Sequence, residues 1–226
     1  MNIVYSRALT TTDRQIASQI IKRQYAESGY TVSEADIDDK MVHFLDQKTA
    51  QVYLAQYENT PLATISLIGD SSAGLPLDEL YKTEIDSLRA QGFRLAEVSQ
   101  LAVDTKHALE FLPEKILKRN LLLFPFFQII LQSAIQKKID ALCIAINPKH
   151  DFFYTTLGFE TIGELKYYTS FNNAPAFAKI LRLDTLTKKK EETNFLSRMM
   201  SDISPIDPLV FTGEQKLIFP LEISQK

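Results

Sequence analysis

The chain has 226 residues, of which 45% are hydrophobic and 23% are charged, so it can bury a full core and is not intrinsically disordered. A net charge of -3 and a pI near 5.7 provide no long-range attraction for phosphate backbones, and no basic patch dominates, so we expect no nucleic-acid partner. The single cysteine, Cys143, cannot form an internal disulfide, and three histidines give no zinc-ligand spacing, so we expect a cytoplasmic protein without a bound metal.

Membrane and export signals are absent from the sequence pattern. The N-terminus has no basic segment followed by an apolar one, which predicts no secretion signal. The most apolar window, residues 121–131, is about half of the roughly 20 residues that cross a bilayer. We therefore expect no transmembrane segment and interpret this window as a buried helix.

The first third of the chain predicts a strand, a helix and a hairpin. Thr12 followed by Gln15 resembles a capping box that opens the helix, and Gly29 ends it. Runs rich in Val, Tyr, Thr and Ile lie on either side of a turn containing Pro61. The strands expected from these patterns are residues 2–7, 51–57 and 62–68.

Helices and strands alternate through the middle of the chain. Apolar spacing predicts a helix over residues 77–91, and a second one that starts at Pro113, is kinked by Pro125 and reaches Ile135. A continuous apolar run predicts a buried strand, and a short helix and a hairpin follow it. The strands expected here are residues 93–103 and 141–146, with the hairpin closing near Leu183.

The composition changes after Leu183. The run Lys188–Glu192 is entirely charged, and three prolines follow it. We therefore expect one α/β domain over residues 1–184, and a linker and arm over residues 185–226.

One motif follows the buried strand directly. Asn147 is followed seven residues later by Tyr154, on a predicted helix, and then by Gly158 and Phe159. This order resembles the GCN5-related N-acetyltransferase superfamily, which implies a central mixed, mostly antiparallel sheet flanked by helices. The resemblance also implies that Tyr154 protonates the leaving thiolate when an acyl thioester is attacked. The alternative is a packed tyrosine before a glycine that ends its helix.

A second motif lies on the strand that would be the fourth of that fold. Alternation places Glu97, Ser99 and Leu101 on one face. In the superfamily a carboxylate on this strand accepts the proton of the attacking amine, so the resemblance makes Glu97 the candidate base. The alternative is a strand glutamate that serves only as an ion-pair partner.

The segment after Val103 departs from the superfamily. Acetyltransferases that use coenzyme A usually carry a glycine-rich loop there, which holds the pyrophosphate, but residues 104–109 contain no glycine. We therefore expect an acyl-phosphopantetheine thioester carried by an acyl carrier protein, with acyl-CoA as the other donor and no tightly bound cofactor. Nearby cations would meet the acidic carrier: Lys106, Lys115, Lys118 and Arg119.

Together these segments look like long-chain N-acyl amino acid synthases, with the resemblance extending over residues 3–183 and including the run Leu75–Leu80. It implies transfer of a fatty acyl group to the α-amine of an amino acid or a similar small amine. Gln100 stands where an arginine is often found, which puts a carboxylate clamp at that position in doubt.

Seven residues are the candidate substrate contacts. His150 would orient a substrate carboxylate or the pantetheine, or else would only bond the helix start. The apolar helix that contains the two phenylalanines would line an acyl tunnel, or else would only be core. The candidates are Ser99, Leu101, Val103, Asn147, His150, Phe124 and Phe127. We expect His43 and His107 at the surface, and Cys143 buried.

Two alternatives remain open. Acyl-homoserine-lactone synthases have a similar Glu-x-Ser-Arg pattern, but they also carry an N-terminal tryptophan and arginine signature, whereas this chain has no tryptophan and has Gln100 in place of the arginine. The other alternative is a relative that binds an acyl group without turnover.

Overall fold

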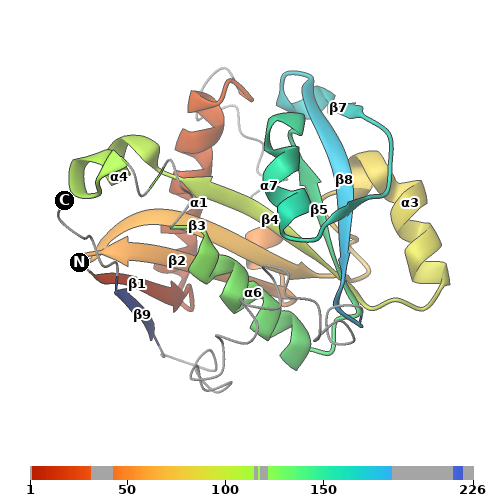
Figure 1. Cartoon of the computed structure of the whole chain (residues 1–226), viewed down its shortest axis with the longest axis horizontal. Coiled ribbons are helices and arrows are strands. Elements are labelled where there is room, and N and C mark those ends of the chain that lie inside the picture. The colour runs from red at the N-terminus through yellow and green to blue at the C-terminus, as the bar shows by residue number, and fades with distance from the viewer. Residues whose placement is uncertain (1, 32–42, 115–116, 118–121, 185–215, 221–226) are drawn as a thin grey trace.

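The structure is a computed structural model that describes residues 2–31, 43–114, 117, 122–184 and 216–220, the last segment by its backbone only. A single sheet runs through the molecule in the order β6-β8-β5-β4-β3-β2-β1-β9, and β7 pairs with β8 (Figure 1). All neighbours are antiparallel except β4 and β5. The strands are β1 (Asn2–Arg7), β2 (Ala50–Tyr57), β3 (Thr60–Gly69), β4 (Leu95–Val103), β5 (Ala141–Ile146), β6 (Glu160–Thr161), β7 (Lys166–Tyr168), β8 (Ala174–Arg182) and β9 (Lys216–Pro220).

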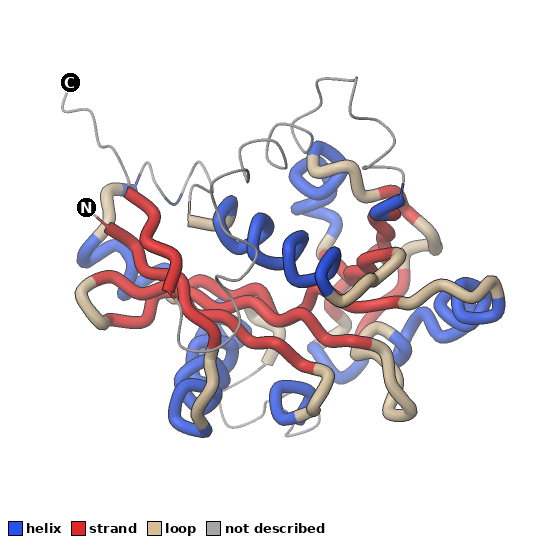
Figure 2. Tube along the Cα trace, turned by 90° about the horizontal axis from the view of Figure 1, so that it is seen from below, coloured by secondary structure: helices blue, strands red, loops and turns tan. Residues whose placement is uncertain are grey.

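Helices cover both faces of this sheet (Figure 2). α1 and α3 pack on one face, and α4, α6 and α7 pack on the other. Strand alternation divides the core accordingly: in β2, Val52 and Leu54 face α1, whereas Tyr53 and Ala55 face α6. The helices are α1 (Thr11–Glu27), α3 (Asp78–Ala90), α4 (Thr105–Phe111), α6 (Phe124–Gln136) and α7 (Asp151–Thr156), with short 3-10 turns η2 (His43–Asp46), η3 (Pro148–His150) and η4 (Thr169–Phe171). In the described part of the chain, none of the helices is long and apolar enough to cross a membrane.

Helix α1 begins with a different capping box from the one predicted. The Asp13 amide donates to Thr10 Oγ1 at 3.1 Å, and the Thr10 amide donates to Asp13 Oδ2 at 3.0 Å. The predicted box of Thr12 and Gln15 is therefore wrong. A carboxylate at this position accepts more strongly than an amide does and complements the positive end of the helix, so Asp13 is the better partner.

Pro125 starts a helix and does not kink one. It lies in the first turn of α6, where its missing amide hydrogen has no intrahelical partner to lose. The single helix predicted from Pro113 to Ile135 is therefore wrong. The sequence analysis also missed α4, whose first turn is capped by Asp104 through the amide of His107.

A β-bulge in β4 changes which side chains share a face. Gln100 has a φ of 55°, and the pairing of β3 with β4 shifts register between Thr64 and Ser66. Because the extra residue interrupts the alternation, Leu101 packs with the core on the α6 face, while Glu97 lies on the α3 face and accepts a bond from the loop before α3. The prediction that Leu101 shares a face with Glu97 and Ser99 is therefore wrong.

The sheet opens next to this bulge. β4 and β5 pair only from Leu95 to Glu97, opposite Ala141 to Cys143. Both strands continue past this point, and their separated ends line one cavity. The split therefore gives a ligand access to the middle of the sheet.

The segment 216–220 adds an edge strand to β1, with Ile3 opposite Phe219. Residues 185–215 and 221–226 lie outside the described residues. The division into a domain over residues 1–184 and a linker and arm over 185–226 thus stays a prediction.

Phe126 of α6 packs its ring against the sheet and contributes to the stability of the core. Its ring is fully buried and lies 5.1 Å from the ring of Tyr5 in an edge-to-face arrangement. We expect Phe126→Ala to lower the free energy of unfolding by about 3–5 kcal/mol, because the truncation leaves a core cavity. Phe152, 84% exposed, is the matched control, and Phe152→Ala should change stability by less than about 0.5 kcal/mol in urea titrations. Equal losses in the two variants would contradict this account of the core.

Candidate active site

A cavity of about 700 Å³ lies at the split between β4 and β5. Its walls come from these two strands, from the turn η3, from Tyr154 of α7, from the loop before α3 and from aromatic residues of α1, β7 and η4. Glu97, Ser99, Leu101, Asn147, His150 and Tyr154 all line it. The structure therefore brings together six of the predicted catalytic and substrate-binding residues.

Glu97 is the buried carboxyl of this cavity. Its side chain is 3% exposed, and its Oε2 accepts a hydrogen bond from the Leu77 amide at 2.8 Å. Burial raises the pKa of the Glu97 carboxyl to about 8, although hydrogen bonds from Leu77 and Ser99 act in the opposite direction. The carboxyl thus exchanges its proton near neutral pH, as a general base requires. No ion pair to Glu97 is seen among the described residues, so the ion-pair alternative is not supported.

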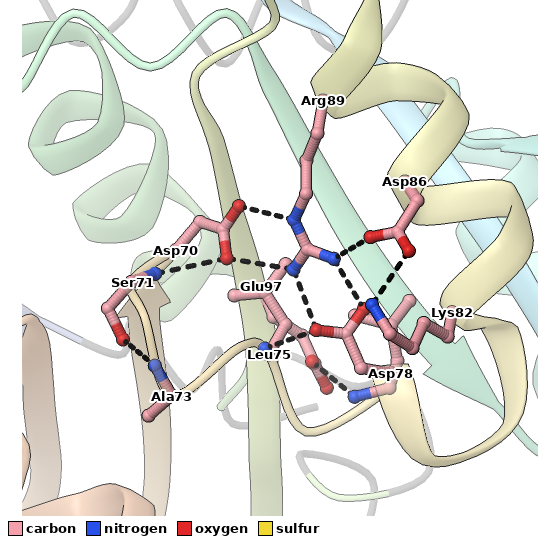
Figure 3. Close-up of polar contacts among 10 residues, drawn as sticks. Asp70, Ser71, Ala73, Leu75, Asp78, Lys82, Asp86, Arg89 and Glu97 are labelled. Carbon is pink, nitrogen blue, oxygen red and sulfur yellow. Dashed lines mark hydrogen bonds and ion pairs between the residues drawn. The ribbon is translucent and has the colours of Figure 1, made fainter.

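The loop that carries the Leu77 amide is held by a charged network (Figure 3). Arg89 donates to both oxygens of Asp70 at 2.7 and 2.8 Å, and to both oxygens of Asp78 at 2.6 and 3.0 Å. Asp78 in turn accepts the Leu75 amide at 2.8 Å. These bidentate contacts fix the loop two residues before the amide that binds Glu97.

Gly74 is required for this loop. Its φ is +75°, and a Cβ placed on it would lie 2.5 Å from Asp78 Oδ2. Any side chain here would displace the carboxylate that joins the loop to Arg89.

Tyr154 lies on α7 with its ring inside an aromatic cluster. The ring centroid is 5.2 Å from Phe153, 5.8 Å from Phe159 and 6.0 Å from Phe127. The residue is 7% exposed, and burial raises the pKa of its phenol, which therefore stays protonated. Tyr154 is thus both a packed ring and a lining residue of the cavity, so the packed alternative and the functional interpretation are compatible.

A buried lysine holds α7 against the sheet. Lys179 of β8 is 2% exposed, and its Nζ donates to the Asp151 carboxylate and to Thr155 Oγ1. These contacts lie on either side of Tyr154 along the helix. They therefore fix the position of the phenol.

Asn147 and His150 lie where β5 leads into α7. The Asn147 side chain accepts the Lys149 amide at 3.1 Å and so caps the turn η3. Burial, with a smaller contribution from Lys149, lowers the pKa of His150, so its ring is neutral near pH 7. Asn147 therefore shapes the turn, and His150 offers an uncharged ring to the cavity.

Three predicted substrate contacts lie outside this cavity. Phe127 packs behind Tyr154, and Phe124 packs 6.4 Å from Phe153. Val103 lines a separate cavity of about 150 Å³ together with Thr105, Leu117, Leu122 and Leu123.

Only one of the predicted carrier-binding cations is described. Lys106 is exposed on α4. Lys115, Lys118 and Arg119 lie outside the described residues.

The sequence analysis missed most of the aromatic side of the cavity. Tyr25, Tyr30, Tyr168 and Phe171 all line it, and so does His43, which had been expected only at the surface. His43 is indeed exposed, but it lies at the cavity beside Phe44. No spacing signal joins these residues, because they come from elements far apart in the chain. Glu79, another lining residue, lies within the run Leu75–Leu80 but had no assigned role.

Comparisons with known proteins agree with this geometry. Residues 16–183 match the family model described as N-acyl amino acid synthase FeeM. The solved structure of FeeM from uncultured soil microbes is 35% identical, covers 80% of this chain and 92% of its own, and gives a TM-score of 0.70. Among curated proteins, none matches the chain.

Two further solved structures share the fold at low identity. An N-acetyltransferase from Staphylococcus aureus Mu50 is 14% identical, with a TM-score of 0.51 over 80% of this chain and 98% of its own. The NatC complex bound to Gag peptide and CoA is 18% identical, with a TM-score of 0.51 over 81% of this chain and 99% of the matched chain. The expected N-acetyltransferase-like fold is confirmed.

The raised pKa of Glu97 predicts how stability depends on pH. The folded carboxyl holds its proton up to about pH 8, whereas the unfolded one releases it near its ordinary value of 4.5. Unfolding therefore releases a proton between these values, and the free energy of unfolding should fall as pH rises through this range. Glu97→Gln should remove this part of the slope and should be more stable than the wild type at pH 8. Urea titrations of both proteins from pH 5 to 9 measure the free energy of unfolding. If this free energy has the same pH dependence in the wild type and in Glu97→Gln, a pKa near 8 is contradicted.

Proposed function

The chain belongs to the FeeM family of N-acyl amino acid synthases and is an N-acyltransferase; from this premise we propose that it moves a long-chain fatty acyl group from a carrier-protein thioester to a primary amine. One observation carries this proposal. A buried carboxyl that titrates near neutral pH and a buried, protonated phenol line the same cavity at the split in the sheet. A module that only binds acyl groups needs neither of them.

Glu97 acts as the base. The amine enters as an ammonium ion, which has no lone pair, and gives a proton to the Glu97 carboxylate. The free amine then attacks the thioester carbonyl carbon, and a C–N bond forms. At about 8, the pKa of Glu97 is closer to the pKa of an ammonium ion than that of an ordinary glutamate is. The free-energy cost of this proton transfer is therefore smaller.

Tyr154 acts as the acid. When the tetrahedral intermediate collapses, the C–S bond breaks and the sulfur leaves as a thiolate. The Tyr154 phenol gives this sulfur a proton. The nitrogen still carries one proton more than the product amide and gives it to the tyrosinate, while Glu97 releases its proton to solvent. The Asp151–Lys179 contact supports this role because it fixes the helix that carries Tyr154.

The start of α4 favours a carrier protein over coenzyme A. In relatives that use coenzyme A, the residues after this strand hold the pyrophosphate. Here Asp104, 3% exposed, places a carboxylate at that position, accepts a hydrogen bond from the His107 amide and pairs with Arg23 at 2.8 Å. Because the Asp104 carboxylate already accepts the His107 amide, this amide is not free to bind a pyrophosphate. We therefore propose an acyl carrier protein in the cytoplasm as the donor, with Lys106, Lys115, Lys118 and Arg119 as its contacts.

The acyl chain requires apolar surface beyond the reacting thioester. The smaller cavity beside Val103 is lined by Leu117, Leu122 and Leu123, on the same face of the sheet as α6. Each methylene of the acyl chain that is buried contributes about 0.8 kcal/mol to the binding free energy, so an extension of this cavity would favour long acyl chains. Phe124 and Phe127 would then bound the chain from α6.

Variants of the two proposed catalytic groups test the mechanism. We expect Glu97→Gln to lower kcat/KM by about 10²-fold and Tyr154→Phe to lower it by about 10- to 100-fold, because each removes one proton transfer. Glu160→Gln and Tyr167→Phe, at exposed positions outside the cavity, are the matched controls. Mass spectrometry of acylated amines, with a panel of carrier thioesters and amines, gives the rates. Full activity in Glu97→Gln with an intact fold would remove Glu97 from the mechanism, and no product from any pair would favour the non-catalytic relative.

The donor is tested with one acyl chain on two carriers. We expect kcat/KM to be about 10-fold or more higher for the carrier protein than for coenzyme A, with the difference shrinking as salt rises. The double variant Lys115→Glu and Lys118→Glu should lose this preference without affecting acyl-CoA. The control is the double variant Lys137→Glu and Lys138→Glu, which reverses two exposed charges that are not among the proposed carrier contacts. Equal use of both donors by the wild type would overturn the carrier assignment.

A further inference from the structure

The deep part of the cavity holds little net charge near neutral pH. Arg89 pairs with both oxygens of Asp78. Glu97, with its pKa raised to about 8, keeps its proton until the pH approaches that value, and Glu79 is exposed and accepts the Ser170 hydroxyl at 2.7 Å. Among the described residues that line the cavity, none is a lysine or an arginine. Within this part of the chain, the α-carboxylate of an amino acid therefore has only neutral hydrogen-bond donors to bind it.

Several of these neutral donors already serve another group of the protein. The Ser99 hydroxyl bonds the Glu97 carboxyl, and the Ser170 hydroxyl donates to Glu79. The Asn147 side chain caps the turn η3 through its oxygen. The phenols are the largest set of donors that remains, and those that line the cavity are Tyr25, Tyr30, Tyr154 and Tyr168.

Three of the four belong to an aromatic wall, which is made of Tyr30, Tyr25, Phe171 and Tyr168. Consecutive rings along this series lie 5.5, 5.8 and 5.7 Å apart. Asn172, the residue after η4, donates its side-chain amide to the Gly29 carbonyl at 3.1 Å and so joins η4 to the end of α1. Ring packing and this bond position the wall, and neither uses the phenol hydroxyls.

Two phenols of the aromatic wall lie near the reacting groups. Burial is the main cause that raises the pKa of Tyr25, and Tyr30, Glu97 and Tyr154 add to it, so the phenol lies within electrostatic range of the proposed base and acid. Burial likewise raises the pKa of Tyr168, with Glu97 as the next cause. Both phenols therefore keep their protons and can donate.

The hydroxyls of Tyr25 and Tyr168 are available to a ligand. Both residues line the cavity, and within the described part of the chain neither hydroxyl has a hydrogen-bond partner. A phenol is a good donor to a carboxylate and brings no positive charge. A cation beside Glu97 would instead lower the pKa of its carboxyl and weaken it as a base. Neutral donors can thus bind a carboxylate here and leave the base intact.

We propose that the phenols of Tyr25 and Tyr168 bind the α-carboxylate of the acceptor, while the acceptor nitrogen lies between Glu97 and Tyr154. This assignment rests on the proposed acyl transfer and names the residues that recognise its acceptor. In an α-amino acid the nitrogen and the carboxylate are attached to the same carbon, so the site that binds the carboxylate must adjoin the base. The two phenols meet this requirement because both lie within electrostatic range of Glu97.

Phenylalanine at either position removes the hydroxyl and keeps the ring. We expect Tyr25→Phe and Tyr168→Phe each to raise KM for an amino acid about 10-fold with kcat little changed, because each loses a hydrogen bond to a charged group. Each amino acid that is acylated is paired with the amine that lacks only its carboxylate, such as phenylalanine with 2-phenylethylamine. KM for the amine should not change. Tyr167→Phe, at an exposed position outside the cavity, is the matched control.

Two outcomes would overturn the carboxylate site while acyl transfer stands. In one, the wild type acylates the amine without a carboxylate as well as it acylates the amino acid. In the other, the two variants change KM equally for both acceptors, or not at all.

If no acceptor is acylated, acyl transfer is wrong, and a binding measurement that needs no turnover decides the carboxylate site. Calorimetry compares N-dodecanoyl-phenylalanine with N-dodecanoyl-2-phenylethylamine, which lacks the carboxylate. Tighter binding of the first compound that is lost in the double variant Tyr25→Phe and Tyr168→Phe, but kept in Tyr167→Phe, supports the site. Equal binding of the two compounds by the wild type, or no binding of either, overturns it.

Discussion

The burial of one carboxyl group, that of Glu97, is the constraint on which the rest of the site depends. Removing a carboxylate from water is costly, and here the Leu77 amide and the Ser99 hydroxyl offset only part of that cost, so the proton affinity of the group rises. The Leu77 amide is available only because the preceding loop is fixed by Asp78 and Arg89. A surface-facing ionic network thus sets the chemistry of a buried group through one stretch of backbone.

The second constraint is the split in the sheet. A regular parallel pair would hydrogen-bond β4 to β5 along their whole length and would leave no space between them. The bulge at Gln100 and the short pairing that ends at Glu97 open a cavity where backbone groups and side chains from both strands face a ligand. The opening lies at the C-terminal end of β5, from which η3 and α7 carry Tyr154 to the same cavity. Base and acid therefore come from the two sides of one gap.

The amine and the carrier protein are proposed to meet parts of the protein that differ in charge. The acceptor side of the cavity is aromatic, with Glu97 protonated near neutral pH and Asp78 paired with Arg89, which suits an amino acid that enters as a zwitterion. The start of α4 is acidic through Asp104, but the segment that follows it in the sequence is basic, which suits an acidic carrier protein and disfavours a free pyrophosphate. Electrostatics thus separates an acceptor without net charge from a thioester delivered by an anion.

Sequence patterns determined the alternation of helices and strands, the buried strand of residues 141–146, and the two motifs that contain Glu97 and Tyr154, because periodicity and short motifs are local properties. Tertiary structure alone decided the rest. The bulge moved Leu101 to the opposite face, and Pro125 started a helix, since each outcome depends on packing partners far along the chain. The aromatic wall joins α1 to η4 and β7 and leaves no spacing signal, and the raised pKa of Glu97 arises from burial, which no run of neighbouring residues encodes.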